Sequence, residues 1–189
     1  MTASGNSRRS RSPACGPLLN HKLPQDLQDT PQSVTVVSEQ LITAQAATRL
    51  EDALKNVPGV TLNAGEGAAR GDTVNLRGFS AFNDFFLDGI RDAAVYTRDS
   101  FDLQSVEVVK GPSAVLFDRG STGGAINQVS KAPFATPLYS LTTNFGSNDL
   151  YRATADINVP VAAATALRLN AMGESSEVAD RDQVKNRRW

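Results

Sequence analysis

The chain has 189 residues, of which 40% are hydrophobic and 21% charged, and its formal net charge is −1. That length allows one ordinary domain with a core and an appendage, and the composition is that of a folded protein. The near-neutral charge, with no basic stripe, argues against a nucleic-acid-binding surface. The single cysteine, Cys15, can form no internal disulfide or cysteine metal cluster. No run of 18 apolar residues is present, which excludes a transmembrane helix.

Residues 1–30 are rich in serine, arginine and proline and lack apolar periodicity, which predicts a disordered segment. Three arginines near its start precede only a short, interrupted apolar run, so no export signal is predicted. The single histidine, His21, lies in this segment and is expected to be solvated. A Ser-His-Asp arrangement is therefore not expected, and we predict that the protein is not an enzyme.

Residues 31–92 predict short strands and helices. Residues 33–37 are β-branched and predict a strand, and Ser38 is expected to cap a helix over residues 39–42. Thr48 and Glu51 have the spacing of a capping box, which predicts a second helix ended by Pro58 and Gly59. The apolar stripe of that helix is expected to pack in the core and comprises Leu50, Ala53, Leu54 and Val57. Further strands are predicted at residues 59–63, 73–77 and 85–87.

Residues 101–131 predict a strand at 105–110, a short helix at 112–117, a glycine-rich loop and a second strand at 125–130. One interpretation of the loop is a rigid corner in which the glycines permit a tight turn. The other is a phosphate-binding loop. The order of the glycines, however, matches neither of the two common phosphate-binding motifs.

Six sequence runs occur in order between residues 31 and 131: PQSVTVVSEQLI, LEDALKNVPGVTL, VNLRGF, FFLDGIRD, VEVVKGPSAVLF and GGAINQVSK. Together they resemble the plug domain of TonB-dependent outer-membrane receptors, most closely those for ferric siderophores. The resemblance implies an α+β fold in which a small mixed sheet carries short helices. Asp118 departs from the pattern, since the family usually has glycine at that position.

The resemblance implies that loops 64–71, 80–84 and 90–99 face the outside and contact the iron–siderophore complex. Arginines suit an anionic chelate and aromatic rings suit its flat surfaces. The residues expected to face the ligand are Arg70, Phe82, Asn83, Arg91, Tyr96 and Arg98. The alternative for each arginine is an ordinary ion pair, and Asp92 and Asp99 are close enough in sequence to provide it.

The resemblance gives Arg77 and Lys110 a different role. In the family these basic positions face the barrel wall and pair with acidic residues there. A buried charge requires such a partner. Without a wall, both residues would have to be solvated or paired inside the plug, with Glu107 as an acidic candidate.

Residues 133–189 change to strict alternation of apolar and polar side chains over three predicted strands, separated by turns at 146–149 and 160–164. The wall of a membrane barrel gives this pattern, and so does a half-buried soluble sheet. After a plug, the barrel interpretation is favoured, and residues 177–189 are expected to begin an outer loop. A barrel of this class needs about 22 strands. We therefore expect a receptor that lacks most of its pore.

The sequence thus predicts a disordered segment at 1–30, a plug at 31–132 and the start of a barrel at 133–189. The predicted function is TonB-dependent uptake of ferric siderophores across the outer membrane, with TonB as partner and no cofactor or resident metal. One alternative is a soluble, plug-like ligand-binding module without transport. Another is a receptor of the same superfamily for cobalamin or sugars.

Overall fold

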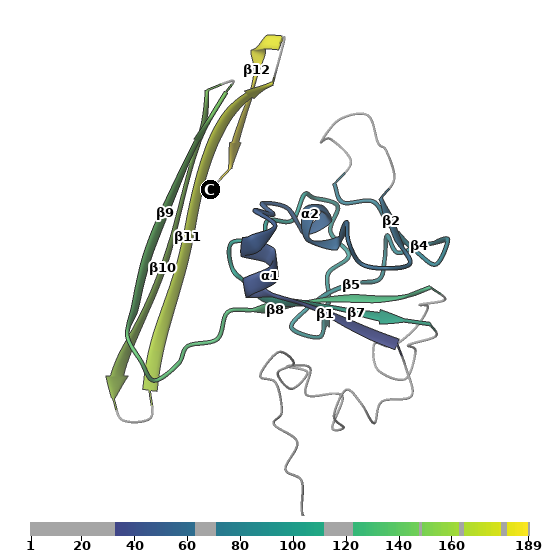
Figure 1. The fold of residues 1–189 in the computed structure, drawn as a ribbon, viewed down its shortest axis with the longest axis horizontal. Coiled ribbons are helices and arrows are strands. Elements are labelled where there is room, and N and C mark those ends of the chain that lie inside the picture. The colour runs from purple at the N-terminus through teal and green to yellow at the C-terminus, as the bar shows by residue number, and fades with distance from the viewer. Residues whose placement is uncertain are drawn as a thin grey trace, which may run out of the picture.

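The computed structural model describes residues 33–62, 71–111, 123–147, 149–162, 165–178 and 181–188. Residues 33–130 form a mixed α/β unit, which we call the plug, and residues 138–188 form a four-stranded sheet, which we call the wall sheet (Figure 1). The segment predicted to be disordered, the short helix predicted at 112–117 and Asp118 lie outside the described residues.

The described residues of the plug form ten helices and strands. Its helices are α1 (Glu39–Ala44) and α2 (Leu50–Leu54). Its strands are β1 (Ser33–Ser38), β2 (Val60–Leu62), β3 (Val74–Leu76), β4 (Phe79–Ser80), β5 (Phe85–Leu87), β6 (Ile90–Arg91), β7 (Leu103–Lys110) and β8 (Gly124–Ser130). These bounds agree with most of the predicted strands to within two residues.

The main sheet of the plug has the order β1-β7-β8-β5-β6, and β2, β3 and β4 form a small separate sheet. Strands β5 and β8 are parallel, whereas the other pairs are antiparallel, so the predicted mixed α+β fold is confirmed. The core between this sheet and the helices contains Leu50, Leu54, Leu76, Phe85 and Val108, all at most 1% exposed. Because the opposite face of the sheet also buries Phe86, Val109 and Ala125, β7 and β8 are buried on both faces.

The predicted caps of the two helices differ in outcome. Ser38 caps α1 as expected, because its hydroxyl accepts a hydrogen bond from the Leu41 amide. The capping box predicted from Thr48 and Glu51 is wrong: α2 begins after Arg49, and the Glu51 carboxylate accepts from the amide of Thr73 instead. The Leu50 amide donates to the carbonyl of Arg98. Tertiary partners therefore replace the local cap that the spacing suggested.

The wall sheet consists of β9 (Leu138–Gly146), β10 (Leu150–Ala162), β11 (Thr165–Val178) and β12 (Arg181–Arg188), antiparallel in the order β12-β11-β10-β9. Its exposed face carries the alternating apolar side chains, among them Tyr139, Leu141, Phe145, Leu167 and Leu169. The predicted alternation is thus confirmed. The expectation that residues 177–189 begin a loop is wrong for 181–188, which form β12 and pair with β11 in antiparallel register.

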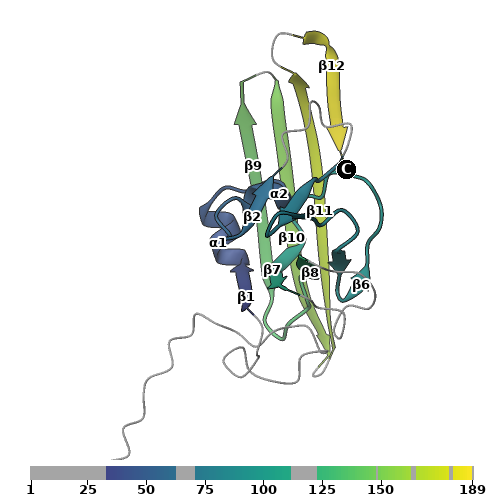
Figure 2. The ribbon, with the colours of Figure 1, turned by 90° about the vertical axis from the view of Figure 1, so that its right-hand side faces the viewer.

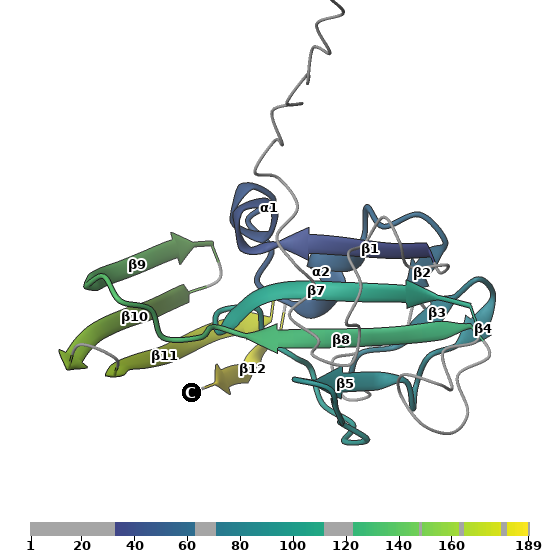
Figure 3. The ribbon, with the colours of Figure 1, turned by 90° about the horizontal axis from the view of Figure 1, so that it is seen from below.

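The wall strands lie side by side behind the plug (Figure 2). Seen from below, the main sheet of the plug lies beside the wall sheet, with both helices on one of its faces (Figure 3). Helix α1 and the end of β8 are close to the wall, whereas the β3–β4 turn and the end of β7 are on the far side (Figures 1 and 3). Neither described helix is long and apolar enough to span a membrane.

Candidate functional site

Four of the six predicted ligand-facing residues lie on the surface of the plug. Phe82, Asn83, Arg91 and Tyr96 are exposed, with 43% of Phe82 and 44% of Tyr96 accessible. The Arg91 Nε atom donates to the Asn83 carbonyl at 2.9 Å, which ties two of the predicted loops together. Arg70 lies outside the described residues. The described surface of loops 80–84 and 90–99 therefore combines aromatic rings with a cation.

Arg98, the sixth predicted residue, is located differently: its side chain is only 3% exposed. Its guanidinium group lies over the rings of Phe85 and Tyr96, at 4.3 and 4.4 Å from their centroids. It pairs with Asp92 at 2.9 Å and with Asp72 at 3.4 Å. The ion-pair alternative considered for this arginine therefore describes the structure, and in it the Arg98 guanidinium is directed into the plug.

The carboxylates around Arg98 experience different environments. Burial raises the pKa of Asp72, although hydrogen bonding and the charge of Arg98 act in the opposite direction. Asp72 Oδ1 has no hydrogen-bond partner among the described residues. Burial would also raise the pKa of Asp92, but the Tyr96 hydroxyl and Arg98 together bring it below its usual range. Burial and the hydrogen bond to Asp92 raise the pKa of Tyr96.

Asp72→Asn is expected to weaken the pH dependence of plug stability. Because the folded pKa of Asp72 is raised above 3.8, the stability that this proton contributes is complete below that pH and is lost as the pH rises through the folded pKa. Asparagine does not titrate, so the free energy of unfolding of the variant relative to wild type should increase from about pH 4 to about pH 7. Urea unfolding across this range measures the difference. A difference that stays constant with pH would contradict the prediction.

The residue after Arg98 faces the wall sheet. Asp99 accepts from both terminal nitrogens of Arg152 on β10, at 2.6 and 2.9 Å. Arg152 also pairs with Glu174 on β11 at 2.7 Å, and Glu174 pairs with Arg188 on β12 at 3.1 Å. We call Asp99, Arg152, Glu174 and Arg188 the upper ion cluster. It connects the plug to three adjacent wall strands.

A second set of charges lies where the plug ends. Lys131 pairs with Asp156 of β10 at 3.0 Å and with Glu39 of α1 at 3.1 Å. Arg168 of β11 pairs with Asp156 at 2.7 Å. We call Glu39, Lys131, Asp156 and Arg168 the lower ion cluster. It fixes the end of β8 to the wall beside α1.

The linker after β8 is also held by the wall sheet. The side chain of Asn158, which is fully buried, donates to the carbonyls of Phe134 and Thr136, each at 2.7 Å, and accepts from the Phe134 amide at 3.1 Å. The guanidinium of Arg168 lies over the Phe134 ring, 5.3 Å from its centroid. These contacts satisfy backbone groups that are not part of any sheet.

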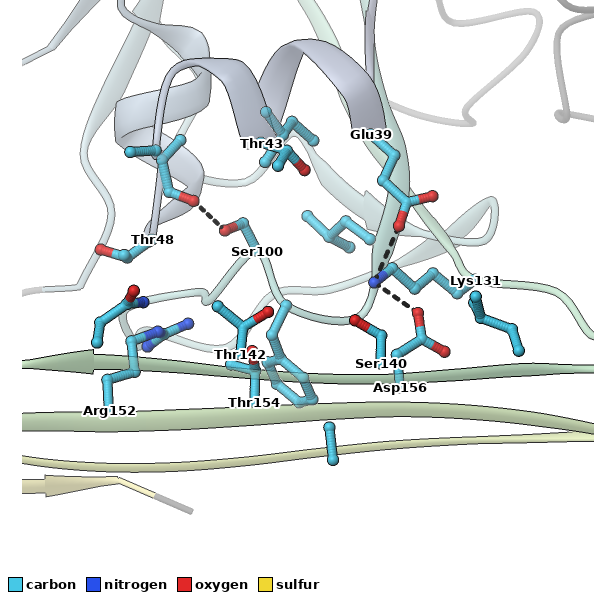
Figure 4. A pocket seen from close by; sticks show the side chains of 18 residues that line it. Glu39, Thr43, Thr48, Ser100, Lys131, Ser140, Thr142, Arg152, Thr154 and Asp156 are labelled. Atoms are coloured by element: carbon cyan, nitrogen blue, oxygen red, sulfur yellow. Dashed lines mark hydrogen bonds and ion pairs between the residues drawn. The ribbon is translucent and has the colours of Figure 1, made fainter.

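A cavity of about 490 Å³ lies between the two ion clusters, bounded by α1 on one side and by β9 and β10 on the other (Figure 4). Hydroxyl side chains from both parts line it: Thr43, Thr48, Ser100, Ser140, Thr142 and Thr154. Apolar side chains such as Ile42, Phe101 and Leu138 also line the cavity, which is large enough to hold water. Ion pairs and polar groups therefore make much of the contact between the plug and the wall sheet.

Sequence reasoning did not identify the residues of the two ion clusters. It assigned contact with the wall to Arg77 and Lys110, which belong to the β3–β4 turn and the end of β7, on the side of the plug away from the wall sheet (Figure 3). Arg77 is exposed, and the Lys110 ammonium donates to the Thr35 hydroxyl. Their pairing with acidic wall residues stays a prediction. The polar positions of the alternating pattern, Arg152, Asp156 and Arg168, were the available signal.

A mixed-sheet plug joined directly to antiparallel strands with an exposed apolar face is the arrangement of a plug followed by the start of a membrane barrel wall. Residues 26–125 match the family model for the TonB-dependent receptor plug domain, so the chain belongs to that family. It is 43% identical over 171 residues to the catecholate siderophore receptor Fiu of Escherichia coli strain K12, a match that covers 89% of this chain and 22% of Fiu. It is 38% identical to the probable TonB-dependent siderophore receptor PiuA of Acinetobacter baumannii, covering 85% and 22%.

Solved structures of these two relatives agree with the fold. The closed form of the ferric-catecholate import receptor Fiu from E. coli superposes with a TM-score of 0.80 at 43% identity, covering 88% of this chain and 24% of Fiu. The siderophore receptor PiuA from A. baumannii gives a TM-score of 0.81 at 36% identity, with the same coverage. The wall sheet matches the first barrel strands of such receptors. The chain spans about a quarter or less of the relatives it matches.

Proposed function

We propose that this chain forms the plug and the first wall strands of an outer-membrane receptor that takes up ferric siderophores with the help of TonB. The observation that carries the proposal is the agreement with the Fiu structure over 88% of the chain, which includes the plug and the strands that follow it. The exposed apolar face of the wall sheet suits contact with lipid, which favours this function over a soluble module.

Ferric catecholates are the proposed ligand class. Relatives named as catecholate receptors reach 43% identity, whereas the ferrioxamine B receptor of Salmonella typhimurium is 32% identical. Catecholate complexes of iron are anionic and aromatic, and Arg91, Phe82 and Tyr96 present matching groups on the plug surface. A second cavity of about 420 Å³ lies beside Tyr96, with Met172 and Arg187 of the wall sheet also lining it.

The test is a titration of the detergent-solubilised chain with the ferric complex of 2,3-dihydroxybenzoate, with ferrioxamine B as the competing ligand class. We expect saturable binding of the catecholate and weaker binding of ferrioxamine B. Arg91→Gln should lower the catecholate affinity at least about fivefold, because it removes an exposed cation at the proposed site. Isothermal calorimetry measures both affinities.

Lys55→Gln is the matched control, because Lys55 is also an exposed cation but lies at the end of α2, outside the predicted ligand-facing loops. It should bind like wild type. Absence of saturable catecholate binding by the wild-type chain would count against the proposed ligand class. An equal loss of affinity in both variants would show that net charge, and not the proposed site, determines binding.

A further inference from the structure

Residues 92–97 connect β6 to the stretch before β7 without forming a helix or a strand. Their backbone carbonyls therefore need partners outside regular secondary structure. Three alternate carbonyls, those of Asp92, Ala94 and Tyr96, accept hydrogen bonds from the two terminal nitrogens of Arg98, at 3.0 to 3.4 Å. The segment thus winds around a single buried guanidinium group.

The same guanidinium is fixed from several directions. The Phe85 and Tyr96 rings lie against it, and Asp92 and Asp72 neutralise its charge. The Asp72 carboxylate also accepts from the Arg98 amide at 2.9 Å, and the Asp72 amide donates to the Tyr96 carbonyl. An arginine can make this many directed contacts because its five donors have a planar, fixed arrangement.

We infer that Arg98 is a positioning residue for ligand recognition: it holds the segment 92–97 in the conformation that presents Tyr96, without contacting the ligand itself. The Tyr96 hydroxyl donates to the same Asp92 oxygen that accepts from Arg98, so the ring is oriented at its face and at its tip. Tyr96 is 44% exposed, so a ligand can reach it. This inference rests on the proposed function, in which Tyr96 faces the siderophore.

Arg98→Lys tests the inference, because lysine retains the charge beside Asp72 and Asp92 but has three donors on a single nitrogen, too few to serve three carbonyls and two carboxylates. In this variant we expect the amide hydrogens of Ala94 and of residue 98 to exchange at least about tenfold faster than in wild type. Catecholate affinity should fall at least about fivefold. Exchange within β7 and β8 should stay as in wild type, which shows that the plug is folded. Hydrogen-exchange mass spectrometry and calorimetry on the detergent-solubilised chain supply the two measurements.

Two comparisons separate positioning from direct contact. Arg91→Gln should lower affinity while exchange in residues 92–98 stays unchanged. Asp92→Asn, which keeps an acceptor oxygen but removes its charge, should accelerate exchange in the same segment and serves if Arg98→Lys does not fold. Loss of affinity in Arg98→Lys without faster exchange would overturn the inference in favour of direct contact. Faster exchange with unchanged affinity would overturn it too.

Failure of the proposed function would give a different experimental result. If the wild-type chain binds no catecholate, the proposed ligand class is wrong and the positioning role for that ligand is wrong with it. The exchange measurement then still decides whether Arg98 orders the segment.

Discussion

Gly124→Ala is expected to unfold the plug. Gly124 begins β8 with φ of +140°, a conformation that L side chains rarely adopt. A Cβ atom built there would lie 2.1 Å from the carbonyl oxygen of Val109 and 3.1 Å from the Lys110 Cα atom. Both neighbours are backbone atoms of β7, an interior strand paired with β8, so they cannot move without separating the two strands.

The expected cost is more than about 4 kcal/mol, which is a large part of the stability of an ordinary domain. Urea unfolding followed by circular dichroism measures it. Gly173→Ala is the matched control, because Gly173 lies in β11 and an added Cβ there would meet no atom within 4 Å. The control should change stability by less than about 1 kcal/mol. A similarly small effect of Gly124→Ala would show that β7 and β8 can adjust.

Arg152→Met is expected to have the second large effect. It should reduce the free energy that holds the plug against the wall sheet by about 3–5 kcal/mol. The Arg152 side chain is 5% exposed and lies between Asp99 and Glu174, which are themselves nearly buried. Its removal leaves two carboxylates with Arg188 as their remaining partner in the upper ion cluster, and Arg188 lies 3.8 Å from Asp99. The uncompensated charge, more than the lost hydrogen bonds, accounts for the cost.

Exchange protection of Ser100 and Phe101 reports this loss, because the Asp99 carboxylate also accepts from both of their amides. The double variant Asp99→Asn with Arg152→Met should recover part of the protection, since it removes the orphaned charge. Arg187→Gln is the control: it removes an exposed arginine of β12 that is not part of the upper ion cluster, and it should leave the protection unchanged. Equal protection in Arg152→Met and wild type would mean that the upper ion cluster contributes little to docking.

The sequence predicted the strands and helix faces that are determined by residues close together in the chain. Alternation located β9, β10 and β11, because the face of a strand is decided by every second residue. Helical spacing identified the buried side of α2, although the cap of that helix was predicted wrongly. Strand β12 carries charged or polar residues at nearly every position, so it has no apolar period. Its pairing with β11 depends on partners such as Glu174 and Arg188, which become neighbours only in the folded sheet.

In the candidate site, too, contacts between residues distant in the sequence could not be predicted. Arg91 and Arg98 belong to one predicted loop, 90–99, and the sequence offered no reason to distinguish them. The structure separates them because folding brings Asp72, 26 residues earlier in the chain, against Arg98, whereas Arg91 stays exposed. The alternation in the sequence placed the polar residues of the wall sheet together on one face. Their individual partners on the plug, such as Asp99 for Arg152, require the docking geometry.

Arg98 and Asp99 are consecutive, yet one is bound to carboxylates inside the plug and the other to an arginine of the wall sheet. An insertion of one residue between Asp92 and Arg98 would lengthen the loop that winds around Arg98, and a deletion would shorten it. A shift between Arg98 and β7 would bring an arginine toward Arg152 and a carboxylate toward Asp72, which is repulsion at both ends. We therefore expect natural homologues to vary this segment by substitution at constant length, and to keep a basic residue followed directly by an acidic one.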